Sequence, residues 1–181
     1  MPDPITVEPY DPAWPGRFRE LAGSLRAQLG DLALRIDHIG STSVPGLAAK
    51  PVIDILISRA ALEPVAAYAP GLERAGFHWR ADNADRLHRY FRETPGMART
   101  HIHVYEAGSW SEQLNLLFRD FLRADSDARR LYAETKIELA VRFRDDRSGY
   151  VDAKAPTVWA LLRRAHEWAQ MVGWSPGPSD A

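Results

Sequence analysis

The sequence predicts an α+β fold: a single domain with a mixed β-sheet, helices packed mainly on one side of the sheet, and further helices towards the C-terminal end. Two patterns support this. Apolar residues recur at helical spacing near both ends of the 181-residue chain, whereas the middle holds short apolar or alternating runs typical of strands. A hydrophobic content of 45% suffices for one sizeable core. We therefore expect one domain over residues 1–172 and a disordered tail over residues 173–181, which contain Pro and Gly.

The first expected helix follows an extended segment at residues 7–10. Asp11 is a candidate N-cap, and Pro12 suits the first helical position. One face of this helix is apolar and is expected to pack on the sheet, because its large residues recur every three or four positions: Trp14, Phe18, Leu21, Leu25 and Leu29. Gly30 is expected to end the helix.

Two strand-like runs come next, at residues 34–39 and 51–57, joined by small residues into a hairpin-like unit. A helix is expected over residues 60–75, with Gly76 as its stop. Beyond it, turn residues separate three short runs that predict an antiparallel meander: residues 77–80, 87–93 and 100–106.

The remainder of the chain is predicted to be helical. Ser109 is expected to cap a helix that runs to Arg123, and Glu112 stands at the spacing of a capping box. Ser126 is expected to cap a second helix through about residue 142, and a third is expected over residues 152–171.

Composition narrows the class of protein. A net charge of −1 argues against binding to a long nucleic acid, which requires many phosphates to be neutralised. The chain has no cysteine, no 18-residue apolar run and no signal-peptide pattern, so we expect a cytoplasmic protein without a membrane span. Only three of the 23 basic residues are lysines, which suggests that an ammonium group is needed at Lys50, Lys136 and Lys154; three chance surface lysines are the alternative.

The chemistry of the chain is concentrated between the first two strands. Gly40 allows backbone to approach a ligand closely, and three hydroxyl residues follow it: Ser41, Thr42 and Ser43. Asp54 is the one charged residue in the apolar second strand. A carboxylate there is costly unless it meets a cation, a hydrogen-bond network or a metal.

These residues lie within HIGSTSVPGLAAKPVIDILI, residues 38–57, which resembles the signature of the GrpB (UPF0157) family, assigned to the nucleotidyltransferase superfamily. Further segments are similar to the same family: YDPAWPGRF near the start, HIHV at residues 101–104, FRDFLR at residues 118–123, and the pairs Tyr132/Lys136 and Tyr150/Lys154. The resemblance covers most of the chain. It implies a nucleotidyltransferase-like mixed sheet packed with helices.

The resemblance also implies roles for these residues. Gly40 and Ser41 are similar to the Gly-Ser turn that binds phosphate at a helix start, where backbone N–H groups favour anions. Thr42 and Lys50 would add donors to phosphate or nucleotide, and Asp54 would be a catalytic residue that holds a metal. A structural turn closed by a hydroxyl cap is the alternative.

The sequence departs from the superfamily at the carboxylates. Active members carry acid-x-acid on the second strand, but here Leu56 follows Asp54. A third carboxylate is expected from a later strand, where this chain has His101 and His103. Either these histidines join Asp54 around a divalent metal, Mg²⁺ or a transition metal that suits imidazole, or they contact substrate, with His103 as acid or base. A structural role for one histidine remains a third option.

The family pattern also picks out basic and aromatic positions on the helices as substrate-binding candidates: Arg119, Lys136, Tyr150 and Lys154. We hypothesise that Lys136 and Lys154 reach a cleft opposite the Gly-Ser turn and bind an anionic substrate. Salt bridges to Asp120 or Glu134 are the alternative. On the strand at 87–93, His88, Tyr90 and Arg92 share one side, which either lines that cleft or covers it.

The function implied is a nucleotidyltransferase-like domain that binds a nucleotide or other phosphorylated small molecule with a divalent metal and transfers a nucleotidyl or related group to an unknown small acceptor. The alternative is a noncatalytic folding-accessory or interaction module with a protein partner, because similar domains are fused to dephospho-CoA kinase. This chain lacks the kinase P-loop. A nucleotide enzyme requires Ser41, Asp54, His103 and the lysines to converge on one cavity, whereas an accessory module requires an exposed apolar patch.

Overall fold

The computed structural model describes residues 4–181 and contains one five-stranded mixed sheet in the order β1-β2-β5-β4-β3. β1 (Arg35–Ile39) is antiparallel to β2 (Ile53–Arg59), and β2 is parallel to β5 (Thr100–Glu106). β4 (Arg89–Glu93) joins β5 to β3 (Phe77–Trp79) through antiparallel pairs. The predicted hairpin-like unit and the predicted meander are both confirmed, and the parallel β2–β5 pair joins them into one sheet.

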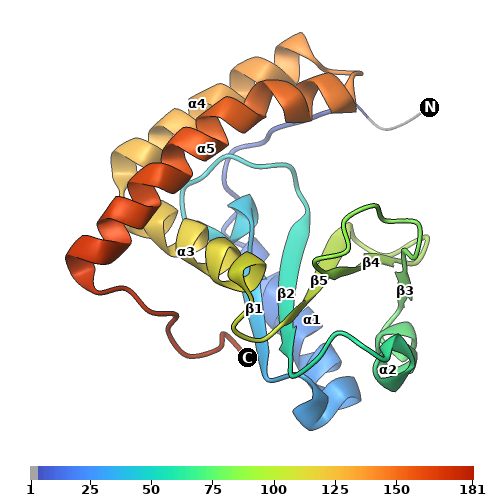
Figure 1. Cartoon of the computed structure of the whole chain (residues 1–181). Helices are drawn as coiled ribbons and strands as arrows, with labels where there is room; N and C mark the ends of the chain where they lie inside the picture. Colours follow the sequence, from blue (N-terminus) through green and yellow to red (C-terminus); the bar gives the residue numbers. More distant parts are fainter. Residues whose placement is uncertain (1–3) are drawn as a thin grey trace.

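Helices cover both faces of this sheet, rather than mainly one side as expected (Figure 1). α1 (Trp14–Leu29) and α2 (Ala69–Arg74) pack on one face, and α3 (Trp110–Ala124) packs on the other. α4 (Ser126–Arg142) and α5 (Arg147–Val172) lie side by side beyond one end of the strands. The α4–α5 pair therefore lies beyond the N-terminal end of β2, close to the C-terminal end of β1.

Strand alternation separates an apolar face of the sheet from a polar one. Ile53, Ile55 and Ile57 of β2 face α1, where they join the main core with Ile102 of β5 and Phe18. Every second residue faces the α3 side instead, which brings together Asp54, Leu56, His101, His103 and Tyr105. The α3 face of the sheet is thus where the polar side chains of neighbouring strands meet.

α1 and α5 begin at other residues than predicted. α1 starts at Trp14, with Pro15 rather than Pro12 in its first turn, although the Asp11 carboxylate still accepts a 2.8 Å bond from Ala13 N. α5 starts at Arg147 rather than near 152, because the Asp146 side chain accepts from Gly149 N.

The predicted cap of α3 is confirmed, whereas the predicted cap of α4 is wrong. Ser109 Oγ accepts from Glu112 N, as expected, but the Glu112 carboxylate binds Gly108 N and Ser58 Oγ instead of closing the capping box. α4 is capped by Asp125, which accepts from two backbone N–H groups, and not by Ser126.

The helix expected over residues 60–75 is much shorter. A 3₁₀ turn occupies Val65–Ala67, and α2 covers only Ala69–Arg74. Pro70 explains this start, because proline suits the first turn of a helix but not its interior.

The C-terminal segment also differs from the expected disorder. Residues 174–181 form no helix or strand, yet they lie along β1, an edge strand of the sheet. Ile36 N donates to Ser179 Oγ, His38 N donates to Asp180 Oδ2, and Ala181 N donates to Ile36 O. The unpaired backbone groups of an edge strand provide the partners that order this segment.

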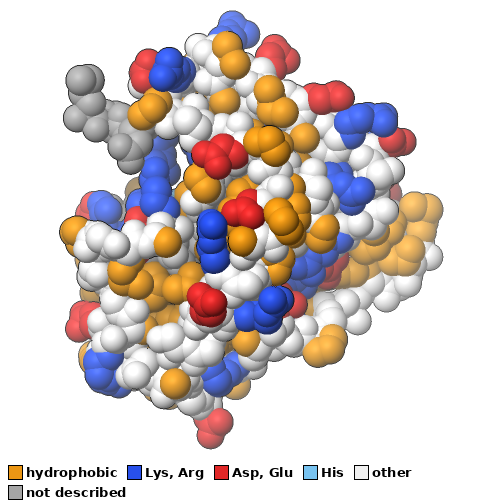
Figure 2. Space-filling view, turned by 180° about the vertical axis from the view of Figure 1, so that it is seen from behind, with side chains coloured by type: hydrophobic (Ala, Val, Ile, Leu, Met, Phe, Trp, Pro, Cys, Tyr) orange, Lys and Arg blue, Asp and Glu red, His pale blue; other side chains and the backbone are white. Residues whose placement is uncertain are grey.

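No helix in the described part of the chain is long and apolar enough to cross a membrane. On the face shown in Figure 2, basic and acidic side chains are interspersed, in agreement with the small net charge.

Candidate functional site

The turn after β1 is pressed against Asp54. Gly40 has φ 69° and ψ −173°, a conformation essentially restricted to glycine, and the 3₁₀ turn Ser41–Ser43 follows it. A Cβ on Gly40 would lie 2.4 Å from Asp54 Oδ2. Only glycine therefore lets this turn approach the carboxylate so closely.

The three hydroxyls of the turn have different surroundings. Thr42 is 1% exposed; its Oγ1 donates to Val52 O and lies 3.0 Å from His38 Nε2, so it fastens the turn to the segment before β2. Ser43 Oγ donates to Gly40 O within the turn. Ser41 is the partly exposed member, and its hydroxyl faces α4.

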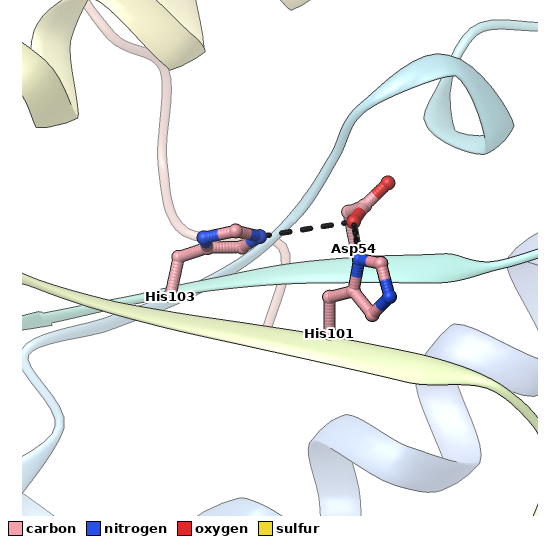
Figure 3. Close-up of side chains that lie close together, drawn as sticks. All are labelled: Asp54, His101 and His103. Atoms are coloured by element: carbon pink, nitrogen blue, oxygen red, sulfur yellow. Dashed lines mark ion pairs between the residues drawn. The ribbon is translucent and has the colours of Figure 1, made fainter. Parts of the chain in front are cut away.

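Asp54, His101 and His103 form a compact cluster on the polar face (Figure 3). Asp54 and His101 are register partners in the parallel β2–β5 pair. His101 Nδ1 lies 3.1 Å from Asp54 Oδ1, and His103 Nε2 lies 3.7 Å from the same oxygen. One ligand atom from each residue can be chosen so that all three lie within 4.8 Å of one another, a spacing that one metal ion can bridge.

The chemistry of this cluster fits a divalent cation. Burial raises the pKa of the Asp54 carboxyl, but the hydrogen bonds from His101 and His103 outweigh burial and hold its pKa below the usual range. Asp54 is therefore ionised at neutral pH. One carboxylate with two imidazoles is a donor set suited to transition metals as well as to Mg²⁺. The outer ring atoms, His101 Nε2 and His103 Nδ1, are buried without a partner among residues 4–181.

Three lysines face this cluster from the α4–α5 side and from the segment before β2. Lys136 Nζ of α4 donates to Ser41 Oγ at 2.9 Å and to Ala48 O at 2.5 Å, and it lies 4.5 Å from the centre of the Tyr132 ring. Lys50 and Lys154 both approach the Tyr150 ring, at 4.6 and 5.5 Å. The two tyrosines thus position the three ammonium groups.

Burial makes these lysines weaker bases. It lowers the pKa of Lys136 to about 7, assisted by the charge of Lys154, and it lowers the pKa of Lys50 to about 8, assisted by Arg147. Burial also lowers the pKa of Lys154, against the opposing influence of Asp54. Within residues 4–181, neither Lys136 nor Lys154 forms an ion pair with a carboxylate; Asp120, one of the alternatives considered, pairs with Arg119 and Arg123.

Two adjoining cavities bring the predicted residues together. One of about 190 Å³ is lined by the phosphate-binding and lysine candidates, with Asp54 and one histidine: Ser41, Thr42, Lys50, Asp54, His101, Tyr132, Lys136, Arg147, Tyr150 and Lys154. Its neighbour, of about 290 Å³, shares four of these residues and adds Gly40, His103 and Arg119. The expected set is divided between the two cavities: Lys50 and Lys136 line the first, His103 lines the second, and Ser41, Asp54 and Lys154 line both.

Arg119 borders the second cavity, but its guanidinium is held by three carboxylates. Its Nη1 lies 3.3 Å from Asp37 and 3.1 Å from Asp180, and its Nε donates to Asp120. The guanidinium is 4% exposed, and the substrate-binding role of Arg119 stays a prediction.

Two residues at or near the site, Asp37 and Arg147, were missed by the sequence reasoning. Asp37, fully buried, lies on the α3 face, which the alternation of β1 would have shown. Arg147 lines the first cavity from the start of α5, whose true beginning was not predicted. The rings of His88, just before β4, and of Tyr90 in β4 lie 5.1 and 5.2 Å from that of His103, so both flank the cluster.

Known proteins with similar sequences include both free-standing and fused relatives. The UPF0157 protein BH1888 of Halalkalibacterium halodurans is 39% identical over 163 residues, which cover 90% of this chain and 83% of the relative. Dephospho-CoA kinase of Mycolicibacterium paratuberculosis is 34% identical, and the match covers 96% of this chain but 49% of the kinase. This chain therefore corresponds to about half of that kinase.

Solved structures agree with the fold. The conserved protein GrpB from Enterococcus faecalis superposes with a TM-score of 0.83 at 32% identity, over 91% of this chain and 99% of the other. Terminal uridylyl transferase 4 from Trypanosoma brucei, with bound dUTP, matches with a TM-score of 0.54 at 15% identity, over 87% of this chain and 56% of the transferase. The second match shows that the fold is nucleotidyltransferase-like. A model of the family described as GrpB protein matches residues 4–164, and with these relatives it shows that the chain belongs to the GrpB (UPF0157) family.

Proposed function

We propose that this GrpB domain binds a nucleotide or another phosphorylated small molecule together with a divalent metal, and that it transfers a nucleotidyl or related group to a small acceptor. One observation carries the proposal. A serine hydroxyl, three lysines and a carboxylate–histidine cluster meet at one pair of cavities on the polar face of the sheet.

The charge balance of the first cavity favours an anionic ligand. Lys50, Lys136, Lys154 and Arg147 line it, whereas Asp54 is the one carboxylate residue in its lining. Buried lysines without carboxylate partners gain most from a ligand that carries several negative charges, because the ligand restores the electrostatic interactions lost on burial. A diphosphate or triphosphate has this property.

Asp54, His101 and His103 are the residues that would hold the metal, which would neutralise phosphate charge and polarise the reacting phosphorus centre. Side chains that line the cavities would bind the substrate and move its protons. Ser41 and the lysines orient the phosphates. In the alternative in which the histidines contact substrate instead of a metal, His103 takes or gives the proton. The transferase neighbour with bound dUTP, which shares the fold, supports nucleotide as the ligand class.

Thermal unfolding with a panel of nucleotides, CoA precursors and the divalent ions Mg²⁺, Mn²⁺ and Zn²⁺ tests the proposal. A ligand present at a hundredfold its Kd should stabilise the protein by about 2.7 kcal/mol. We expect such a shift with one nucleotide only when metal is present, and we expect Asp54→Asn to abolish it. Asp82→Asn, at an exposed carboxylate on the β3–β4 loop, is the matched control and should keep the shift. Absence of a shift with every combination would overturn the nucleotide site.

A second function, that of a folding-accessory or interaction module for dephospho-CoA kinase, is favoured by a separate observation. An apolar groove of about 530 Å³ runs between α3 and α5, and two exposed tryptophans border it, Trp110 at 66% and Trp159 at 59% exposure. Relatives in which this domain forms about half of a dephospho-CoA kinase suggest a kinase as partner. Co-expression of the chain with such a kinase should raise the yield of folded kinase, and Trp159→Ser should remove the effect. An unchanged yield would leave only the nucleotide function.

A further inference from the structure

Ser41 and Lys136 form a contact that phosphate binding alone does not require. The two atoms, Ser41 Oγ and Lys136 Nζ, lie 2.9 Å apart, and the residues come from the turn after β1 and from α4, 95 positions apart in the chain. The second hydrogen bond of Lys136, to Ala48 O, fixes the direction of the amine. The Nζ atom of Lys136 is therefore held within hydrogen-bond distance of the Ser41 hydroxyl.

The surroundings of Lys136 favour an amine that exchanges its proton near neutral pH. The residue is 3% exposed. Tyr132 faces it from its own helix, Ser41 from the turn and Lys154 from α5, and Asp54 on β2 acts on Lys154. As a neutral amine, Lys136 can still donate to Ala48 O while its lone pair accepts the Ser41 hydroxyl proton.

Ser41 is also placed as a reacting group would be. It follows the Gly40 turn, it is partly exposed, and it lines both cavities beside Asp54. Ser43, two positions later, offers a built-in comparison, because its hydroxyl is occupied by Gly40 O and has no lysine nearby in the contacts of the turn.

We propose that Ser41 is a nucleophile and Lys136 its general base, and that the phosphorylated ligand of the proposed function is a phosphoric anhydride attacked at phosphorus by Ser41 Oγ. Lys136 Nζ takes the hydroxyl proton as the Oγ–P bond forms. The P–O bond to the leaving phosphate breaks, and that phosphate departs with the bonding electron pair. An acceptor alcohol then attacks the same phosphorus and gives its proton to solvent water. The Oγ–P bond breaks with its electron pair on Ser41 Oγ, and the protonated Lys136 returns the proton to that oxygen. This inference rests on the proposed function for its substrate class.

The absence of an acid at position 56 gives a chemical reason for the Ser41–Lys136 dyad. With Leu56 at the position of the second acid, packed among Ile39, Tyr105 and Leu116, the described lining of the two cavities holds Asp54 but no second carboxylate to help activate an acceptor directly. A hydroxyl with its own base supplies an activated nucleophile without that carboxylate. Lys50, Lys154 and Arg147, around the same cavity, stabilise the negative charge that develops on the phosphoryl oxygens.

Diisopropyl fluorophosphate tests the dyad without knowledge of the nucleotide. Attack on this probe forms an Oγ–P bond, expels fluoride and leaves a stable adduct that peptide mass spectrometry can locate. We expect the adduct on Ser41, with no adduct on Ser43 or on the exposed Ser24. The rate should rise through about pH 7 to a plateau, and it should fall about a hundredfold in Lys136→Met and Lys136→Arg, the second of which keeps the charge but cannot serve as a base.

Folding of each variant is checked by its thermal unfolding curve, and labelling rates are compared between folded proteins. Absence of a Ser41 adduct in the folded wild-type protein, or an equal labelling rate in a folded Lys136 variant, would overturn the dyad. Neither result affects the metal-dependent nucleotide shift and its loss in Asp54→Asn. The dyad and the proposed function can therefore fail separately.

Discussion

Asp37 lies directly opposite Leu56 in the antiparallel β1–β2 pair. Opposite residues in such a pair point to the same face, so a carboxylate stands one strand away from the position where active members of the superfamily carry their second acid. It is not free to replace that acid. Both Asp37 oxygens accept from Arg35 at 2.9 Å, and Arg119 Nη1 lies 3.3 Å from one of them. Leu56 stands at the position of the second acid, and the Asp37 carboxylate on the neighbouring strand belongs to a buried ion network.

Asp37→Asn should therefore affect stability strongly. The carboxylate is 0% exposed and Arg119 is 4% exposed, so the substitution leaves buried guanidinium charge less well compensated. We expect the free energy of unfolding to fall by about 3 kcal/mol, as for other buried ion pairs that lose one partner. Urea unfolding followed by circular dichroism measures this change.

The control for that substitution is Asp127→Asn, at an ion pair with Arg130 in which both side chains are more than two-thirds exposed. Solvent screens such pairs, so the free energy of unfolding should hardly change. Equal effects of the two substitutions would contradict a structural role for the Asp37 network.

Gly40→Ala should damage both the turn and the site. The residue has positive φ, and its new Cβ would come within 2.4 Å of Asp54 Oδ2 and 3.0 Å of Asp54 Cβ. Backbone strain and the clash together should lower the free energy of unfolding by about 3 kcal/mol or more. Gly46→Ala is a matched control at φ +78° with no atom within 4 Å, and it should lose only about 1–2 kcal/mol from backbone strain. Similar losses in urea unfolding would mean that the turn does not press on Asp54.

The sequence was sufficient to predict the parts of the site that depend on strand alternation. A period of two places His101 and His103 on one face, and a single charge in an apolar strand marks Asp54. The structure brings all three together because β2 and β5 are paired in parallel. That pairing is a long-range choice, and periodicity within one strand carries no information about its neighbour.

Strand alternation could not predict where α4 and α5 begin or which residues contact Arg119. Asp125 and Asp146 cap α4 and α5 although later residues were equally good candidates by type. The partners of Arg119 lie 82 and 61 positions away, one of them in a segment whose Pro and Gly content predicts disorder. Composition describes what a segment does alone, whereas here an edge strand supplies the partners that order it.

The pH dependence of stability should report the buried amine of Lys136. Its pKa is about 7 in the folded protein and near the ordinary value of 10.5 in the unfolded chain. Between these values the unfolded chain binds a proton that the folded protein has released. Stability therefore rises with pH, by up to about 1.4 kcal/mol per pH unit, and the penalty of burying a charged amine is full below about pH 7.

Lys136→Met removes the amine and with it the penalty, so the variant should be more stable than the wild type at pH 7. This difference in the free energy of unfolding should shrink as the pH rises from 7 to 10 in a series of urea unfolding curves. Lys50→Met is the comparison, and its difference from the wild type should begin to change only above about pH 8. Parallel pH profiles for wild type and Lys136→Met would contradict a lowered pKa at Lys136.

The C-terminal segment should protect the edge of the sheet. Ser179 Oγ and Asp180 Oδ2 accept from the outward N–H groups of Ile36 and His38, each at 2.9 Å. Deleting residues 179–181 exposes these two amides to water, so their hydrogen exchange should become faster, while that of Ile102 and Val104 in the central strand β5 should change much less. Asp180→Ala, which removes the His38 acceptor and one partner of Arg119, should lower the free energy of unfolding by about 1–2 kcal/mol. Unchanged exchange at Ile36 and His38 after the deletion would show that the segment leaves β1 in solution, because an amide that has truly lost its acceptor cannot keep the same protection.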